Sequence, residues 1–419
     1  MSNHFKHTIF ARFLKWIALA CLIGVLAGAA SAAFLLALDT VTAWRGQHRW
    51  LIWLLPLAGL LVAWLYRQYG AGSDAGVNLL LTATRAPGPA IPLRMAPLVL
   101  FGTLASHLFG ASVGREGTAV QMGGALSDQL SKLFQVAPET RIVVITAGMA
   151  AGFASVFGTP VAGAIWGIEV MAFAGLAGAA RLPGLPACLL TCTLSAVIAH
   201  LVTLGLGAHH AHYAAGAVPT LGALPLLAVA VAGTAFGLTA RAFCTASHGL
   251  SALFRRYVSS SLLRPVIGGA VIVLFAMTVG DADRYLGLGL PVIQAAFSGH
   301  VMPQDFLVKL GMTAWSVASG FKGGEVTPLF FIGSTLGHVL APLLQLPPPF
   351  LAAVGLAAVF AGASNTPLAC TMIAIELFGA DIAVYAGVAC AASYLVSGRH
   401  GIYGAQRLLY PKLGKRLDA

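Results

Sequence analysis

The residues that suggest chemistry are glutamates placed in apolar sequence. The chain contains only five glutamates, and four of them lie among glycines and aliphatic residues: Glu116, Glu169, Glu325 and Glu376. A charged carboxylate in the core of a bilayer costs several kcal/mol, so such a residue is by default a functional-site hypothesis. A carboxylate accepts hydrogen bonds when ionised and donates one when protonated. These residues therefore point to proton or anion chemistry.

Glu116 lies in the glycine-rich segment GREGT at residues 114–118. Glycines on both sides allow the backbone to approach a ligand closely, and the turn opens a helix whose free N–H groups favour anions. A carboxylate at this place can occupy an anion site itself and leave the site when it is protonated. The segment predicts coupling of protons to anions, with a purely structural Glu116 as the alternative.

Glu325 lies in a second glycine-rich loop, GFKGGEVTP at residues 320–328. Two glycines precede a predicted helix start, and Pro328 stands in its first turn. Glu325 can carry chemistry there, or it can merely cap the helix N-terminus. Glu169 and Glu376 each end an apolar helix, and for them we expect structural pairing at an interface.

Three other patterns could carry chemistry. Residues 110–114 match the GxSxG pattern of a nucleophilic serine, with His107 or His200 as its base, but that pattern needs a preceding strand. The sequence before it reads as an apolar helix, so an intramembrane serine hydrolase is the remote alternative. The histidines of residues 209–212 lack acidic partners, and the six cysteines lie in apolar stretches without CxxC spacing. We expect no metal site, no cofactor and no disulfide.

The composition is that of a membrane protein. Only 9% of the 419 residues are charged, whereas soluble chains average about 25%. Residues 182–240 and 326–375 contain no charged residue, and both stretches exceed the roughly 20 residues that cross a bilayer once. A β-barrel would show short alternating segments with frequent charges. The sequence therefore predicts an all-α polytopic membrane protein.

The net charge of +11 fits membrane topology better than nucleic-acid binding, because the basic residues cluster at the chain ends and in short connections. Arg255, Arg256 and Arg264 form one such cluster. Cytoplasmic loops carry this excess of Lys and Arg, so we expect both termini in the cytoplasm. Trp16–Leu38 is longer than the apolar region of a signal peptide and is expected to be the first, uncleaved helix.

The chain contains an internal repeat. Residues 148–169 align with residues 355–376 at an offset of 207, and ten of the 22 positions match, including a Thr-Pro pair and the final glutamate. Upstream, Gly110, Gly114, Gly123 and Leu126 fall on Gly320, Gly324, Gly333 and Leu336 at an offset of 210. Paired apolar segments interrupted by Gly and Pro point to the central site of a transporter.

Several apolar segments are expected to be short or broken helices. Trp50–Tyr66 is shorter than a full span, and Leu286–Pro291 is interrupted by Gly and Pro. Broken helices place N-termini inside the membrane, where the natural ligand is an anion and irregular backbone needs a pathway around it. We expect one membrane domain over residues 1–419, with halves 16–205 and 222–405 and tails 1–15 and 406–419.

At residues 114–117 the sequence resembles the CLC family of chloride channels and proton-coupled anion transporters, whose signature there is GREGP or GKEGP. GGEVTP at residues 323–328 resembles the family's GGxFxP loop, and FGTPVAG at residues 157–163 resembles its FNAPLAG segment. The resemblance extends from the first helix to Tyr403. It implies two inverted-topology halves of broken, tilted helices, and a homodimer with one pathway in each subunit. No C-terminal regulatory domain is expected.

The departures from the chloride-type pattern resemble one branch of the family. Thr118 replaces the proline of GREGP, and Glu325 and Thr327 stand in a loop that is apolar in chloride members. GSDAGVN at residues 72–78 stands where chloride and nitrate members have GSGIP or GPGIP. Together with GIYG at residues 401–404, these features are similar to the fluoride-selective bacterial branch, the fluoride/proton antiporters.

Two further positions differ from the family pattern. Val170 occupies the place of the internal proton glutamate of chloride exchangers. The fluoride branch has Asn or Met near position 77, where this chain has Val77, and Asn78 takes that role in a register shifted by one.

Carried over by position, the resemblance implies that Glu116 is the gating glutamate and that Glu325 and Thr327 move fluoride and protons. The tyrosine hydroxyl of GIYG and backbone amides of the GGEVTP loop line the central anion site. The implied anion-binding residues are Gly114, Arg115, Gly117, Val77, Asn78, Glu325, Val326 and Tyr403. Fluoride is a small, strongly hydrated acceptor, and hydroxyls or a protonated carboxylic acid are suitable donors for it.

The resemblance therefore implies a proton-coupled antiporter, not an enzyme, that exports fluoride from a bacterial cytoplasm. We expect it in the inner membrane, with the lipid bilayer, fluoride, protons and a second copy of itself as partners and no nucleic acid. The alternative is a chloride/proton exchanger or a passive anion channel. Electrical driving force does not separate these, because either would expel an anion from a cell that is negative inside.

Overall fold

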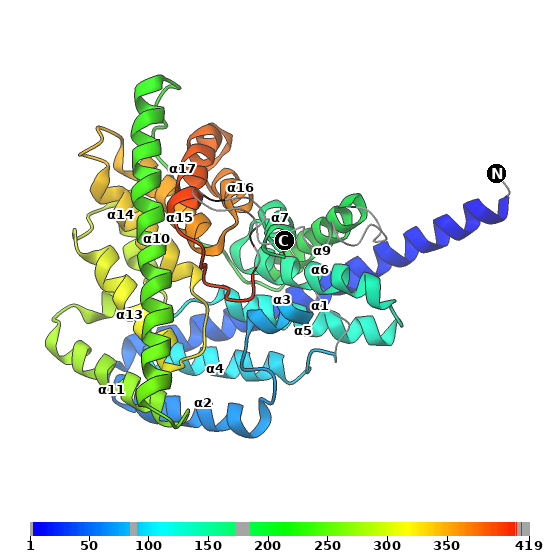
Figure 1. Ribbon diagram of the computed structural model, residues 1–419, viewed down its shortest axis with the longest axis horizontal. Helices are drawn as coiled ribbons and strands as arrows, with labels where there is room; N and C mark the ends of the chain where they lie inside the picture. Colours follow the sequence, from blue (N-terminus) through cyan, green and yellow to red (C-terminus); the bar gives the residue numbers. More distant parts are fainter. Residues whose placement is uncertain (1–2, 84–89, 172–184, 407, 409–411, 413–419) are drawn as a thin grey trace.

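The structure, a computed structural model, describes residues 3–83, 90–171, 185–406, 408 and 412. The regular elements within these residues are helices, which confirms the predicted all-α class (Figure 1). In chain order they are α1 (Asn3–Gln47), η1 (Arg49–Leu54), α2 (Leu55–Tyr69), α3 (Val77–Ala83), α4 (Met95–Phe109), α5 (Glu116–Leu133), α6 (Pro138–Phe157), α7 (Pro160–Val170), α9 (Leu185–Gly205), α10 (Ala223–Tyr257), α11 (Leu263–Thr278), η2 (Ala282–Arg284), α12 (Leu290–Ser298), α13 (Asp305–Ser319), α14 (Val326–Leu340), α15 (Pro348–Ser364), α16 (Pro367–Phe378), η3 (Ala380–Ile382) and α17 (Ala383–Val396).

Two long helices flank the molecule. α1 packs on α5, α6 and α9, and its N-terminal part projects beyond these helices (Figure 1). α10 packs on α13, α15 and α17, which belong to the second half of the chain. Shorter helices fill the space between them, as expected where helix ends must lie inside a membrane.

Equivalent helices of the two repeats begin at corresponding residues. α4 and α13 begin at Met95 and Asp305, and α5 and α14 begin at Glu116 and Val326, so each pair lies at the offset of 210 found in the sequence. α7 and α16 follow, each with proline as its first residue, and pack against each other. The predicted repeat is therefore confirmed.

Glycines let neighbouring helices of each repeat pack backbone to backbone. Gly123 of α5 faces Gly148 of α6, and Gly333 of α14 faces Gly355 of α15. A Cβ atom on Gly123 or Gly333 would lie 2.2 or 2.1 Å from the carbonyl oxygen of the facing glycine. Larger residues would separate these helices, so the repeated glycines have a packing reason in both halves.

Five helical stretches within the described residues are long and apolar enough to cross a membrane. They are Leu14–Gln47, Arg49–Tyr69, Thr140–Phe157, Ala187–Gly205 and Ala223–Tyr257. The prediction that Trp50–Tyr66 is shorter than a span is wrong, because η1 continues directly into α2 and gives 21 helical residues. Other apolar helices are shorter, with only 11 residues in α7 and 12 in α16.

The predicted break at Leu286–Pro291 is confirmed. Gly287 and Gly289 have φ angles of 55° and 73°, in the left-handed region that favours glycine, and α12 begins at Leu290. The N–H of Gly287 donates to the carbonyl of Ala111 at 3.2 Å. The broken segment of the second half therefore contacts the loop before Glu116 in the first half.

Candidate functional site

The two glycine-rich loops meet at the centre of the site. The N–H of Gly114 donates to the carbonyl of Gly324 at 2.5 Å, and the N–H of Gly324 donates to the carbonyl of Gly114 at 2.7 Å. A Cβ on Gly324 would lie 2.7 Å from the backbone nitrogen of Gly117. Glycine is thus needed for the loops to approach, and their contact brings together the N-termini of α5 and α14.

The carboxylate of Glu116 lies between these two helix starts. The backbone N–H of Thr327 donates to Glu116 Oε2 at 3.1 Å, and the Thr327 hydroxyl donates to Oε1 in a short hydrogen bond. The backbone N–H of Arg115 donates to Oε2 at 3.2 Å, and Arg115 Nε lies 3.6 Å from Oε1. Glu116 is only 1% exposed, so a buried carboxylate fills a site built from donors and positive helix ends.

Glu325 lies on the wall of a cavity of about 360 Å³. It occupies the N-cap position of α14, but its side chain makes no capping hydrogen bond. The alternative of a capping carboxylate is therefore contradicted. Val326, Tyr403 and Gly117 line the same cavity, so it reaches the loops that hold Glu116.

Val77 and Asn78 also lie on the cavity wall, at the first turn of α3. Val77 is buried and presents an apolar surface. Asn78 Oδ1 accepts a hydrogen bond from the backbone N–H of Ala405 at 2.9 Å. Asn78 therefore fixes the segment that carries Tyr403, a contact between residues far apart in the chain.

Thr118, which departs from the family proline, has a defined partner. Its hydroxyl lies 2.6 Å from that of Thr103 on α4. Proline could not form this contact, and the hydrogen bond joins α4 to the first turn of α5 directly behind Glu116.

Glu169 and Glu376 cap each other's helices. The carboxylate of Glu169, at the end of α7, accepts the N–H groups of Leu368 and Ala369 in the first turn of α16 at 3.0 and 2.8 Å. Glu376, near the end of α16, accepts the N–H groups of residues 161 and 162 in the first turn of α7 at 3.0 and 2.7 Å. The expected structural pairing is confirmed, and its donors are free amides of helix N-termini.

The competing patterns find no support in the geometry. Ser112 follows a helix and its hydroxyl lies 3.0 Å from that of Thr313, while His107 Nδ1 lies 2.8 Å from the carbonyl oxygen of Thr103. His107 is thus engaged within its own helix and is not paired with Ser112. Among the described residues, no group of three His, Cys, Asp or Glu side chains is arranged to hold a metal ion.

Three cavity residues escape the reasoning from sequence. Gln121 Nε2 donates to the carbonyl of Gly117 at 3.0 Å, one helical turn away. Asp74 and Lys322 form an ion pair of 2.5 Å at the cavity wall. Asp74 and Lys322 are charged residues inside glycine-rich segments. An isolated charge in such a segment is also the signal that pointed to Glu116 and Glu325.

The sequence pattern of the family described as voltage-gated chloride channel matches residues 58–398. The chain is 51% identical to a "Chloride/fluoride channel protein" of Pseudomonas syringae, over 95% of this chain and 87% of that protein. It is 27% identical to the "H(+)/Cl(-) exchange transporter ClcA" of Vibrio cholerae, over 86% and 81% of the two chains.

A solved structure described as a CLC-type fluoride/proton antiporter superposes with a TM-score of 0.89 and 34% identity, covering 97% of this chain and 99% of that one. This agreement confirms the predicted fold of two inverted repeats of broken helices. The match spans most of the chain in sequence and nearly all of it in structure, and the chain therefore belongs to the CLC family of anion channels and transporters.

Proposed function

We propose that the chain is a proton-coupled fluoride antiporter. The observation that carries this proposal is the carboxylate of Glu116, which a hydroxyl and two backbone amides bind as they would bind an anion. The relatives described as a chloride/fluoride channel protein and as a fluoride/proton antiporter support fluoride as the anion. Proteins of this family are transporters or channels, so we propose no enzymatic activity.

Exchange follows from competition for the same donors. When Glu116 is ionised, its oxygens accept hydrogen bonds from the Thr327 hydroxyl and from the amides of Thr327 and Arg115. A free anion then cannot bind these donors. Protonation removes the negative charge and weakens these hydrogen bonds. The side chain can then leave, and fluoride can bind the donors that it vacates. One proton on Glu116 therefore accompanies the admission of an anion.

Glu325 and Tyr403 extend the pathway along the cavity. Both side chains line it, and Glu325 is free of the capping role that would fix it in place. A protonated Glu325 donates one hydrogen bond, as a tyrosine hydroxyl does, and fluoride accepts both strongly. We assign Glu325 to fluoride binding and to proton transfer between the cavity and Glu116.

We further propose a homodimer in a bacterial inner membrane, with both termini in the cytoplasm. The basic cluster around Arg255 and Arg256 at the end of α10 supports this orientation. Residues 1–419 would form one membrane domain with halves 16–205 and 222–405. At about 100 mV, exchange of one fluoride for one proton moves two charges and gains roughly 4.6 kcal/mol, against roughly 2.3 for fluoride alone.

The test uses purified protein in liposomes loaded with fluoride, with fluoride efflux and external pH recorded together. We expect fluoride efflux accompanied by proton uptake, and slower exchange when chloride replaces fluoride. Fluoride efflux without proton movement would make the protein a channel. A preference for chloride would make it a chloride/proton exchanger.

Glu116→Gln tests the gating role in the same liposomes. The amide cannot carry the exchanged proton, so we expect proton movement to stop and fluoride flux to fall because the side chain no longer leaves on protonation. Persistence of pH-driven fluoride movement in Glu116→Gln would overturn the role of Glu116.

A further inference from the structure

Positively charged side chains lie at the mouth of the cavity. Its lining includes two cationic side chains, those of Lys322 in the loop before α14 and Arg255 of α10, together with the imidazole of His248. The acidic residues on its wall are Asp74 and Glu325. Fixed positive charge in a cleft raises the local concentration of anions, so Lys322 and Arg255 favour the approach of anions here.

Lys322 is held in a defined position at this mouth. Its Nζ lies 2.5 Å from Asp74 Oδ1 and 4.0 Å from the centre of the Tyr66 ring. Its Cβ lies so close to Gly102 that a Cβ there would meet it at 2.9 Å. The glycine and the aromatic ring therefore fix the stem and the ammonium group, three residues before Glu325.

Asp74 is held much less firmly than Lys322. Its side chain is 74% exposed, whereas that of Lys322 is 22% exposed. Exposed ion pairs contribute about 0–1 kcal/mol, because water screens them and the side chains lose freedom. A diffusing anion can therefore displace Asp74 at little cost, while the lysine stays in place.

We propose that Lys322 is an anion-capture site at the cytoplasmic mouth, and that the carboxylate of Asp74 is a tethered competitor which an incoming fluoride ion displaces. The inference rests on the proposed transport of fluoride and adds an entry step to it. When fluoride is scarce, the Asp74 carboxylate pairs with the Lys322 ammonium group. As the fluoride concentration rises, fluoride takes the place of the carboxylate. The competition sets the fluoride concentration at which export becomes fast.

The test measures the initial rate of fluoride uptake into inverted membrane vesicles, whose cytoplasmic face is outside, with an acidic lumen and graded external fluoride. We expect Lys322→Met to raise the KM for fluoride about fivefold, since an ion pair of this kind is worth about 1 kcal/mol. Met keeps the aliphatic contacts with Gly102 and Tyr66, so packing is retained. Asp74→Asn should lower the KM by a factor of about two to five.

A double variant links the two residues. Asp74→Asn should have no effect on KM in the Lys322→Met background, because the ammonium group with which the Asp74 carboxylate pairs is then absent. Lys322→Arg keeps the charge and should restore the KM to within about twofold of wild type. Added inert salt should raise the wild-type KM and leave that of Lys322→Met nearly unchanged.

Arg255 and Arg256 provide a matched control, since they are adjacent in α10 and only Arg255 lines the cavity. We expect Arg255→Gln to raise the KM and Arg256→Gln to leave it unchanged. In every variant the number of protons moved per fluoride should equal that of wild type. Unchanged KM values in Lys322→Met and Asp74→Asn, with coupled exchange intact, would overturn the capture site alone, whereas absent exchange in wild type would overturn the proposed function.

Discussion

Thr327 is the residue on which the candidate site depends most directly. It donates to both oxygens of Glu116, once through its hydroxyl and once through its backbone amide. A hydrogen bond to a charged group contributes about 1.5–3 kcal/mol, so the hydroxyl matters both for holding Glu116 and for binding the anion that replaces it. The two roles follow from the same contact.

We therefore predict that Thr327→Val slows fluoride/proton exchange by about tenfold or more, because Val matches the shape of Thr and lacks its hydroxyl. Thr327→Ser keeps the hydroxyl and should retain most of the exchange rate. The measurement is coupled flux in liposomes, with thermal stability in detergent as the folding control. Equal rates in the Val and Ser variants would exclude a role for the hydroxyl.

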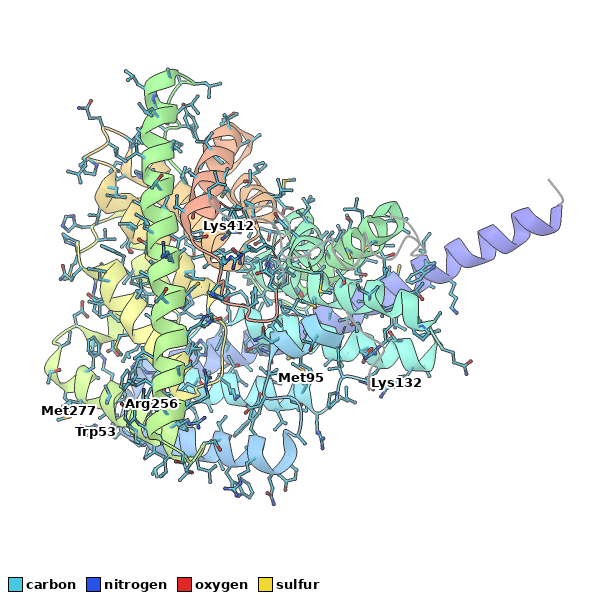
Figure 2. All side chains as sticks on the ribbon, viewed as in Figure 1. Trp53, Met95, Lys132, Arg256, Met277 and Lys412 are labelled. Atoms are coloured by element: carbon cyan, nitrogen blue, oxygen red, sulfur yellow. The ribbon has the colours of Figure 1, made fainter. Side chains whose placement is uncertain are left out.

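Lys412 is a second residue whose environment has a measurable consequence. Its ammonium group donates to Asn365 Oδ1, Ser397 Oγ and the Gly398 carbonyl at 2.6, 2.8 and 2.6 Å, close to the end of α17 (Figure 2). Burial lowers the pKa of Lys412 to about 8. The unfolded chain, with a lysine pKa of about 10.4, then binds more protons than the folded protein between these values.

The resulting prediction concerns pH. The contribution of Lys412 to stability is complete above the unfolded pKa and decreases as the pH falls through about 8. As the pH rises from about 7 to about 10, the melting temperature of wild type should therefore increase relative to that of Lys412→Met. Thermal unfolding in detergent at several pH values measures it. A difference independent of pH would show that the folded and unfolded pKa values coincide.

At the scale of elements, α7 and α16 are joined by reciprocal contacts. Each helix has a glutamate in its last turn, and the carboxylate of this glutamate accepts two N–H groups from the first turn of the other helix. Free amides at a helix start cost several kcal/mol each when lipid surrounds them, so the arrangement satisfies groups that water cannot reach. It also explains two intramembrane glutamates that need no part in transport.

We predict that Glu169→Ala and Glu376→Ala each lower the free energy of unfolding by about 1–2 kcal/mol, as loss of a helix cap does. Glu169→Gln should lose less, because its side-chain oxygen still accepts one N–H. Melting temperature and proton-coupled flux, taken from the same sample, separate the two roles. Normal stability with lost coupling would place these residues in the proton pathway instead.

Reasoning from sequence reached these elements unevenly. The repeat, the loops around Glu116 and Glu325 and the break before α12 could be predicted, because glycine, proline and isolated charges mark them locally. The partner of Asn78 could not, since Ala405 is brought to it only by tertiary packing. The same holds for the pair of Asp74 and Lys322. The length of the helix through Trp50–Tyr66 was mispredicted, since hydropathy does not reveal that a 3-10 helix continues into an α-helix.

At the scale of the whole molecule, the two repeats share one packing solution. In each repeat a glycine pair brings two helices into backbone contact, and α15 packs on α14 as α6 packs on α5. These contacts lie behind the loops that carry Glu116 and Glu325. The separation of the helices therefore determines where the loops meet.

Gly355 and Gly311 offer a matched comparison of this packing. A Cβ on Gly355 of α15 would lie 2.3 Å from the Gly333 carbonyl oxygen, whereas a Cβ on Gly311 of α13 would meet nothing within 4 Å. We predict that Gly355→Ala lowers the free energy of unfolding by about 1–3 kcal/mol through overpacking, while Gly311→Ala is neutral or stabilising by up to about 1 kcal/mol. Thermal stability of the purified variants measures both. A melting temperature of Gly355→Ala equal to wild type would contradict the close packing.

The paired hydrogen bonds between Gly114 and Gly324 have a kinetic consequence. A mechanism that swings one half of the chain against the other would break both bonds in every cycle, whereas rotation of a glutamate side chain breaks neither. Rotation of exposed side chains takes nanoseconds or less, whereas collective domain motion takes microseconds to milliseconds. With diffusional encounter at about 10⁹–10¹⁰ M⁻¹s⁻¹, protons reach a single group at most about 10²–10³ times per second at neutral pH, which is an upper limit for the buried Glu116. Proton arrival therefore sets a ceiling on turnover, and we expect export to accelerate as the outer compartment becomes more acidic.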